Sequence, residues 1–329
     1  MITVGLVLSA GGTSGAAYHS GVLSGLFEAT GWDPRTADLI VGTSAGASTA
    51  VGLRAGLSAT DHAAYYSNEE LSPEGQMIRD RVVTPLSLPK SPPPHKSLWP
   101  ASPYLILQGV LGRGRPRPVV SLAGMLPEGQ GDASSLSARI NESHPDPWPN
   151  MSTWICSVDF DSGKRVVFGR DDVECDVGTA VQASSSIPGY FRPVELNGVR
   201  YVDGGIHSST NADLVAPLGL DVVVISSAMT AVPSESSWPG GPIGRAWHSR
   251  TLRREVERIR SYGTSVLVFQ PTSEDLRVRG EDNMSVDNPE EICQMAKTST
   301  LAHLSNPHAL KSRKILERSI NQSLSLIHI

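Results

Sequence analysis

The chain has 329 residues, of which 39% are hydrophobic and 19% charged, and its formal net charge is −5. This composition is typical of a globular protein with one large domain or two smaller ones. The mild acidic balance and the lack of a basic block argue against nucleic acid as a partner. Three widely spaced cysteines argue against a disulfide framework and for a reducing, cytoplasmic location.

The sequence indicates neither a metal site nor a membrane span. No Cys/His cluster has the spacing of metal ligands. The apolar segment 2–8 is too short for a signal sequence or a spanning helix, and no later segment is long enough. We therefore expect no metal, and a cytoplasmic protein that meets membranes only peripherally.

The first 70 residues predict two successive strand–turn–helix units. Residues 2–8 form a continuous apolar run of the buried-strand type, followed by a glycine-rich turn and a helical pattern through Leu26. A second strand is expected at 39–41. After a sharp turn, a helix is expected to end near Gly56, with a short helical piece at 61–66.

Prolines crowd residues 72–131 and change the character of the chain. Proline removes a ladder donor and restricts the residue before it, so no regular sheet is expected here. We expect an excursion over one end of the sheet, with short helices near 104–111 and 134–141. One interpretation is a lid or a lipid-contacting surface that exposes Trp99, Tyr104 and Leu105–Leu107. The other is a loop without such a role.

Strand signals return after residue 150. We expect strands at 153–158 and 165–168, joined by a hairpin turn, and strands at 194–196 and 199–202, joined by Asn-Gly. A helix is expected at 177–185, a strand at 220–226, a long polar helix at 246–262 and a last strand at 265–269. Residues 289–322 are helical in pattern. This alternation predicts an α/β fold with a mainly parallel sheet.

A serine stands at the apex of the turn after the second strand. Gly42-Thr43-Ser44-Ala45-Gly46 reads Gly-x-Ser-x-Gly, and glycines on both sides relieve the clashes of a strained strand-to-helix turn. The hydroxyl would project beside the positive end of the helix and could attack an acyl carbon. The Ala45 amide could then stabilise the oxyanion. Packing alone could also produce such a turn.

A glycine-rich turn follows the first strand. Gly11, Gly12 and Gly15 open a helix, so their amides can form a nest that suits an anion. Dinucleotide binding is disfavoured because Ala10 stands where the Gly-x-Gly-x-x-Gly motif requires glycine. An oxyanion hole is the other interpretation.

An aspartate ends the expected strand at 199–202. Asp203 is followed by Gly204 and Gly205, which would let its carboxylate face a cleft. By itself, this pattern more often marks an aspartate that caps a turn.

Together, these three motifs resemble those of the patatin-like phospholipase family. The order is a glycine-rich loop, then Gly-x-Ser-x-Gly, then Asp-Gly-Gly far downstream. The segment 183–191 is also similar to an Ala-Ser-x-x-x-Pro block of that family. The resemblance spans about 3–230 and implies one three-layer α/β/α domain over 1–322, with the excursion at 72–131 and a helical part at 289–322. Residues 323–329 resemble translated adapter read-through and are left out, so the native C-terminus is expected to lie elsewhere.

The resemblance further implies a lipid acyl hydrolase that works through an acyl-enzyme, with no metal or organic cofactor. Ser44 would be the nucleophile, Asp203 the general base, and the amides of Gly11, Gly12 and Ala45 the oxyanion hole. A carboxylate is a weaker base than imidazole, so the site would need desolvation. Phospholipid or neutral lipid substrates would lie at membranes, so transient surface contact through the excursion is expected. The oligomeric state is not indicated.

Two features depart from the family pattern. Its loop is commonly Gly-Gly-Gly-x-Arg/Lys-Gly, whereas Ala10 replaces the first glycine here and Ser14 replaces the basic residue. The loop amides survive, so hydrolysis stays compatible with this sequence. The lost charge would weaken recognition of anionic headgroups or loosen the packing of the loop.

Two alternatives stay open. A Ser-His-Asp esterase or thioesterase would use His19, His207 or His248. The serine turn follows only the second strand, whereas such hydrolases need several strands before it. The other alternative is a lipid- or partner-binding module that keeps the fold but has lost catalytic efficiency.

Overall fold

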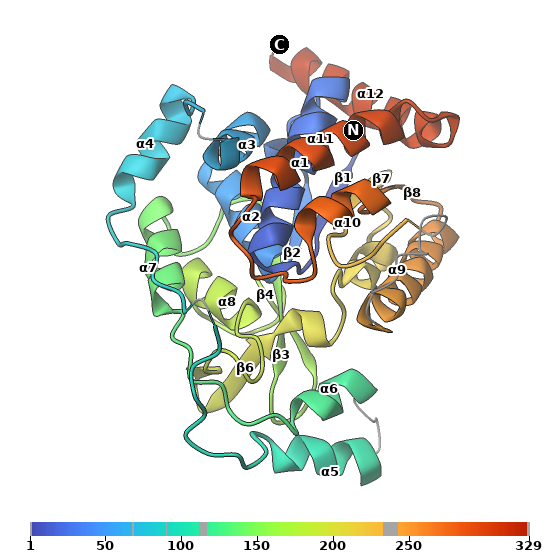
Figure 1. Cartoon of the computed structure of the whole chain (residues 1–329). Coiled ribbons are helices and arrows are strands. Elements are labelled where there is room, and N and C mark those ends of the chain that lie inside the picture. Colours follow the sequence, from blue (N-terminus) through green and yellow to red (C-terminus); the bar gives the residue numbers. More distant parts are fainter. Residues whose placement is uncertain (1, 68, 90, 112–116, 233–242, 328–329) are drawn as a thin grey trace.

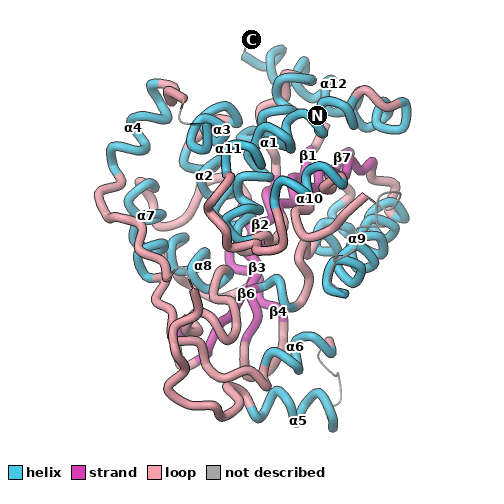
Figure 2. Tube along the Cα trace, viewed as in Figure 1, coloured by secondary structure: helices cyan, strands magenta, loops and turns pink. Residues whose placement is uncertain are grey.

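Helices pack on both faces of one central sheet (Figures 1 and 2). The computed structural model describes residues 2–67, 69–89, 91–111, 117–232 and 243–327. Within these residues the sheet has eight strands: β1 (Val4–Leu8), β2 (Leu39–Thr43), β3 (Thr153–Asp159), β4 (Arg165–Phe168), β5 (Val194–Leu196), β6 (Val199–Asp203), β7 (Val222–Ser226) and β8 (Ser265–Phe269).

The strand order is β5-β6-β3-β2-β1-β7-β8, and β4 also pairs with β3. The run from β3 to β8 is parallel throughout. The pairs β3–β4, β3–β6 and β5–β6 are antiparallel. The predicted α/β fold with a mainly parallel sheet is therefore confirmed.

The described helices are α1 (Gly12–Thr30), α2 (Ala45–Ala55), α3 (Ala59–Ser67), α4 (Pro73–Arg81), α5 (Pro103–Leu111), α6 (Pro118–Ala123), α7 (Ser134–Ser143), α8 (Val177–Ser184), α9 (Ile243–Ser261), α10 (Ser273–Arg279), α11 (Pro289–Leu304) and α12 (Leu310–Ile327). Short 3₁₀ turns are η1 (Pro34–Thr36), η2 (Gly204–Ile206), η3 (Ala212–Leu218) and η5 (Pro307–Ala309). The sequence analysis did not predict α4, α6 or α10.

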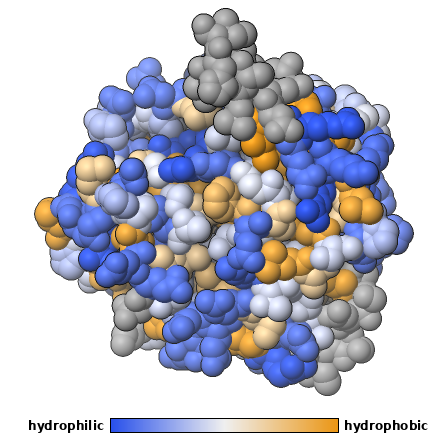
Figure 3. Space-filling model, turned by 90° about the horizontal axis from the view of Figure 1, so that it is seen from above, coloured by the Kyte–Doolittle hydropathy of each residue, from blue (hydrophilic) through white to orange (hydrophobic). Residues whose placement is uncertain are grey.

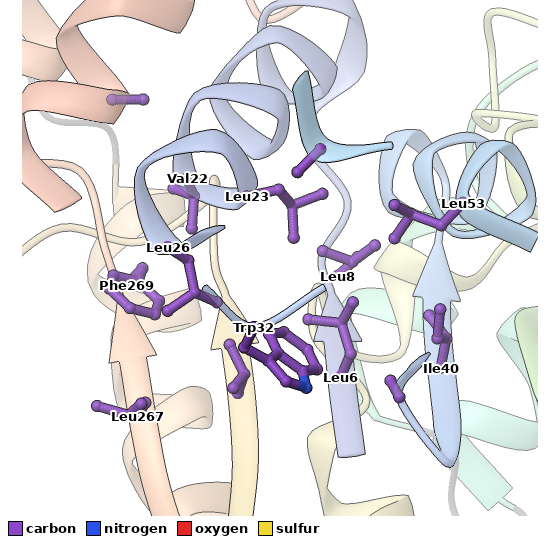
Figure 4. Packing of buried hydrophobic residues seen from close by; sticks show 14 of the residues in the cluster. Leu6, Leu8, Val22, Leu23, Leu26, Trp32, Ile40, Leu53, Leu267 and Phe269 are labelled. Atoms are coloured by element: carbon purple, nitrogen blue, oxygen red, sulfur yellow. The ribbon is translucent and has the colours of Figure 1, made fainter. Parts of the chain in front are cut away.

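Strand β1 shows how the layers form. Successive side chains of a strand point to opposite faces, so Leu6 and Leu8 pack with α1 and α11 while Val7 packs with η3 and α9. Figure 4 shows Leu6 and Leu8 beside Trp32 and below the apolar side of α1. Burial on both faces explains why β1 is apolar without alternation.

One edge of β3 positions Asp203 and also Thr43, the residue before Ser44. Cys156 pairs with Thr43 of β2, and the next residue, Ser157, pairs with Asp203 of β6. Both Cys156 and Ser157 also pair with β4, which therefore occupies the other edge of β3. Strands β2 and β6 thus follow one another along the same edge and meet at their carboxyl ends.

The proline-rich excursion runs from α4 to the α5–α6 end of the molecule, mostly as loop (Figures 1 and 2). Trp99 is 81% exposed and Tyr104 is 56% exposed, as expected. The prediction was wrong for Leu105, which is 0% exposed because it packs against Val158 and Val202. Seen from above, the molecule is mainly hydrophilic, with small separate hydrophobic patches (Figure 3).

The C-terminal helix continues beyond the expected end. Helix α12 runs to Ile327, whereas the sequence prediction ended the helical part at residue 322. Residues 328–329 of the excluded tail lie outside the described residues.

None of the described helices combines the length and the apolar character needed to cross a membrane. The single-domain organisation and the cytoplasmic location stay predictions.

Candidate active site

Ser44 occupies a strained turn between β2 and α2. Its φ is 53° and its ψ is −119°, a combination that costs an L-residue about 1–3 kcal/mol. The flanking glycines make this turn possible. A Cβ at Gly42 would lie 2.6 Å from the Ala47 Cα, and one at Gly46 would lie 2.1 Å from the Leu8 carbonyl oxygen. Only glycine fits at both positions.

Hydrogen bonds to neighbouring strands hold the turn. The Ser44 amide donates to the Ser184 Oγ at 2.9 Å, and that hydroxyl donates to the Cys156 carbonyl at 2.6 Å. The Gly46 amide donates to the Ser9 carbonyl at 3.0 Å. Ser184 was not singled out by the sequence analysis, although it lies in the 183–191 block.

Hydrogen bonding by the Ser44 side chain is one of the influences that lower the pKa of the Asp203 carboxyl. Both residues are 5% exposed, and the Gly205 amide donates to the Asp203 Oδ1 at 2.7 Å. Burial raises the pKa of Asp203 from 3.8 to about 6, and the two hydrogen bonds lower it only in part. Asp203 is therefore a stronger base than an exposed aspartate, and it is ionised at neutral pH.

The glycine-rich loop lies against residues that adjoin this pair in the sequence. A Cβ at Gly205 would lie 2.9 Å from the Asp203 Oδ1 and 3.1 Å from the Ala10 Cβ. A Cβ at Gly15 would lie 3.8 Å from the Ala45 Cβ. The three motifs, far apart in the sequence, therefore meet at the carboxyl end of the sheet.

The helices after the two loops begin at Gly12 and Ala45. Amides at the first helical positions have no intrahelical acceptor and lie at the positive end of the helix dipole. Gly12 has a φ of 63°, and a Cβ there would lie 2.3 Å from the Asn283 carbonyl oxygen. Gly11 precedes it as the helix N-cap. This arrangement can bind a developing negative charge.

The glycines after Asp203 are also constrained by close packing. A Cβ at Gly204 would lie 2.3 Å from the Cys156 carbonyl oxygen. The same carbonyl accepts a hydrogen bond from Ser184, which binds the serine turn. One carbonyl group of β3 therefore supports both the serine turn and the aspartate turn.

A buried polar network holds the loop after Asp203. Asn211 has a φ of 51°, and its Nδ2 donates to the Thr43 Oγ1 at 3.1 Å and to the Ser208 carbonyl at 2.7 Å. The Glu255 carboxylate, from α9, accepts from the Ser208 Oγ at 2.7 Å and from the Thr210 Oγ1 at 2.5 Å. The sequence analysis missed the residues of this loop because they form no recognised motif, and it missed Glu255 because α9 lies far along the chain.

The candidate histidine His19 is held by residues at the ends of β1 and β7. His19 Nδ1 is 2.7 Å from the Ser226 Oγ and its Nε2 is 2.8 Å from the Ser9 carbonyl oxygen, and burial lowers its pKa to about 4. Within the described residues, no hydrogen bond joins His19, His207 or His248 to the Ser44–Asp203 pair. His19 instead fixes the end of β1.

An apolar groove of about 240 Å³ begins one helical turn from Ser44. Ser48, whose amide donates to the Ser44 carbonyl at 3.2 Å, lines the near end. The walls come from α1 to α4 and α7, and include Ala16, Val51, Gly52, Leu57, His62, Tyr65, Tyr66, Ile78, Leu136 and Ile140. Across the described part of the chain, no group of three or more His, Cys, Asp or Glu is placed to hold a metal ion.

The chain has similarity to one protein family and to solved structures. A sequence model of the patatin-like phospholipase family matches residues 6–216. The structure is similar to VipD from Legionella pneumophila, with 12% identity over 93% of this chain and 67% of that one and a TM-score of 0.44. It is also similar to the type III effector protein ExoU, with 16% identity over 92% of this chain and 53% of that one and a TM-score of 0.36. The chain thus spans about two thirds of VipD and about half of ExoU. Because the family match covers well over half of its residues, the chain belongs to the patatin-like phospholipase family.

Proposed function

We propose that the protein hydrolyses acyl esters of lipids, with Ser44 as nucleophile and Asp203 as general base. The raised pKa of the buried Asp203 carboxyl, on which the buried Ser44 hydroxyl acts, carries this proposal. Asp203 takes the hydroxyl proton while the Ser44 Oγ bonds to the ester carbonyl carbon. The proton then passes to the leaving alcohol as the ester bond breaks. Water repeats the sequence on the acyl-serine and releases the carboxylic acid.

The oxyanion formed in each half-reaction would be bound by backbone amides. We assign this role to Gly11, Gly12 and Ala45, at the starts of α1 and α2. Two helix dipoles then point their positive ends at the same developing charge. The pKa of about 6 at Asp203 suits a base that must be ionised near neutral pH and still accept a proton.

The apolar groove is the proposed binding site of the acyl chain. Its near end at Ser48 lies four residues along α2 from Ser44, or about 6 Å at 1.5 Å per residue. Its walls carry aliphatic and aromatic side chains from five helices. Each methylene group that it buries would contribute about 0.8 kcal/mol to binding.

The α5–α6 end is the proposed site of membrane-surface contact. Exposed apolar side chains gather in this part of the chain: Leu98, Trp99, Tyr104, Leu107, Leu122, Met125 and Leu126. Trp and Tyr favour the interface between lipid and water.

A fluorophosphonate probe tests the enzyme assignment. The wild-type protein should be labelled covalently, as shown by mass spectrometry, whereas Ser44→Ala should not. Ser14→Ala, which removes a different hydroxyl near the loop, should still be labelled. A wild-type protein that is neither labelled nor active on any ester would favour a binding module without catalysis.

Esters of graded chain length test the groove. We expect kcat/KM for p-nitrophenyl esters to rise about fourfold for each added methylene, the equivalent of about 0.8 kcal/mol, until the groove is full. Ser48→Phe should remove this rise and leave the acetyl ester almost unaffected. The matched Ser261→Phe change, at the end of α9, should preserve the rise.

Sedimentation with phospholipid vesicles tests the contact surface. The Leu98→Ser/Trp99→Ser variant should bind vesicles more weakly than wild type, whereas Tyr262→Ser, which alters an exposed aromatic residue at the end of α9, should bind equally. Equal binding by all three proteins would argue against contact through the excursion.

A further inference from the structure

A buried arginine from the C-terminal part of the chain contacts the glycine-rich loop. Arg279 is the last residue of α10 and is only 3% exposed. Its Nη2 donates to the Ser14 Oγ at 3.1 Å and to the Asn283 Oδ1 at 3.2 Å, while its Nη1 donates to the Ala228 carbonyl. It lies outside residues 6–216, which match the family.

Across the described residues, the guanidinium of Arg279 makes no direct salt bridge, although the charge of Asp275 raises its pKa from a greater distance. Within the same part of the chain, its Nε is buried without a hydrogen-bond partner. The hydrogen bonds of Asp275, one turn earlier on α10, come from Thr272 and Ser299. Burial lowers the pKa of Arg279 to about 10, so the guanidinium stays charged at neutral pH. Water and counter-ions screen such a charge only weakly.

This guanidinium lies next to the proposed oxyanion hole. Its Nη2 is 4.0 Å from the position that a Cβ of Gly15 would occupy, and the Ala45 Cβ is 3.8 Å from the same position. The group therefore approaches the side of Gly15 that also faces the residue after the nucleophile. At this range a weakly screened positive charge would lower the energy of an oxyanion.

The residues after α10 also clamp the first turn of α1. The Asn283 carbonyl accepts from the Ser14 amide at 3.2 Å, the Ser14 Oγ at 3.2 Å and the Thr13 Oγ1 at 3.4 Å. Arg279 holds the side chain of the same asparagine. Arg279 and Asn283 therefore bind the loop as one unit.

We propose that Arg279 is a positioning residue of the hydrolase: it holds the glycine-rich loop through Ser14 and Asn283, and its charge stabilises the oxyanion without touching substrate. Ser14 stands where loops of the family commonly carry Arg or Lys, so α10 brings the positive charge to this place from another part of the chain. The inference rests on the proposed function.

Two substitutions separate the charge from the shape of the side chain. Arg279→Met keeps most of the length and removes the charge, whereas Arg279→Lys keeps the charge and loses the forked geometry. For Arg279→Met we expect kcat for a p-nitrophenyl ester to fall about 10- to 100-fold, or about 1.4–2.8 kcal/mol, with KM changed less than about threefold. Arg279→Lys should recover a large part of this loss.

Arg54→Met is the matched control. Arg54 is also mostly buried and also binds carbonyl groups, to Arg35 at 2.7 Å, Ala37 at 2.8 Å and Ser152 at 3.0 Å. Burial lowers its pKa to about 10 as well, but it lies at the other end of the sheet. Its loss should lower stability and leave kcat per folded molecule unchanged, with the folded fraction measured by circular dichroism.

The outcomes are distinguishable. The role of the charge would be overturned if Arg279→Met had the kcat of wild type. It would also be overturned if the kcat of Arg279→Lys were no higher than that of Arg279→Met. A wild-type protein without esterase activity or probe labelling would overturn the proposed function, and this inference with it. A selective fall in kcat at Arg279, rescued by lysine and absent at Arg54, would support the proposal.

Discussion

The two ends of the parallel strands hold their polar groups in different ways. At the amino end, Arg54 donates to three carbonyl groups and to the Thr153 Oγ1. The Asp38 carboxylate accepts from the Val4 amide at 2.6 Å, and the Asp221 carboxylate accepts from the Thr3 amide at 2.8 Å. These side chains provide hydrogen-bond partners for backbone groups at the ends of strands and loops, and so stabilise the fold.

At the carboxyl end, polar groups are held at a cost in stability. Ser44 has a positive φ, Asp203 is an ionised carboxylate in a buried place, and the Arg279 Nε has no partner among the described residues. Strain and desolvation raise the energy of these groups, and desolvation makes the Asp203 carboxylate more basic. One end of the sheet therefore stabilises the fold, and the other holds the groups to which we assign the chemistry.

The largest expected effect comes from removing the proposed base. Asp203→Asn should lower kcat/KM by about 10²–10⁴-fold, because an amide cannot accept the proton of Ser44. Steady-state hydrolysis of a p-nitrophenyl ester measures this loss. In the wild type, kcat/KM should fall about tenfold for each pH unit below about 6, because Asp203 must be ionised. A flat profile between pH 5 and 7 would argue against Asp203 as the base.

The opposite end of the sheet should respond in stability alone. Arg54→Met leaves several carbonyl groups without a donor and should lower the free energy of unfolding by about 2–4 kcal/mol. Chemical denaturation measures this change. A large loss of kcat per folded molecule would remove the distinction between the two ends.

The cost of burying Asp203 should be visible as a dependence of stability on pH. Its pKa rises from 3.8 in the unfolded chain to about 6 in the folded one. The folded state therefore holds the proton more tightly, so the contribution of Asp203 to stability is greatest below pH 4 and is lost as the pH rises through 6. This loss is about 3 kcal/mol.

Unfolding of Asp203→Asn at several pH values measures this contribution. The variant should gain stability relative to wild type as the pH is raised from 4 to 8. A constant difference over this range would show that burial does not raise the energy of the ionised Asp203.

The smallest expected effect concerns the strained turn. Ser44→Gly should be more stable than Ser44→Ala by about 1 kcal/mol, because glycine adopts a positive φ without a Cβ clash. Thermal unfolding of the two variants makes the comparison. Equal melting temperatures would mean that the turn stores little strain.

Local sequence patterns predict much of the fold. The apolar runs at β1, β7 and β8 and the Asn-Gly turn between β5 and β6 were each recognised from a few neighbouring residues. Helix α10 was missed, although Thr272 and Asp275 form a capping box that marks its start. The surface prediction failed at Leu105 because a single apolar residue in a proline-rich segment does not reveal which side it buries.

The sequence by itself determined the strand–turn–helix at Ser44 and the glycine-rich turns, because these depend on steric limits within a few residues. The meeting of Ser44 with Asp203, 159 positions later, depends on the order and register of β2, β3 and β6. The support from Ser184 and the approach of Arg279 also required the tertiary structure, because hydrogen bonds between distant residues follow from packing. Local patterns therefore located the groups proposed to react, and the assembled sheet decided which of them meet.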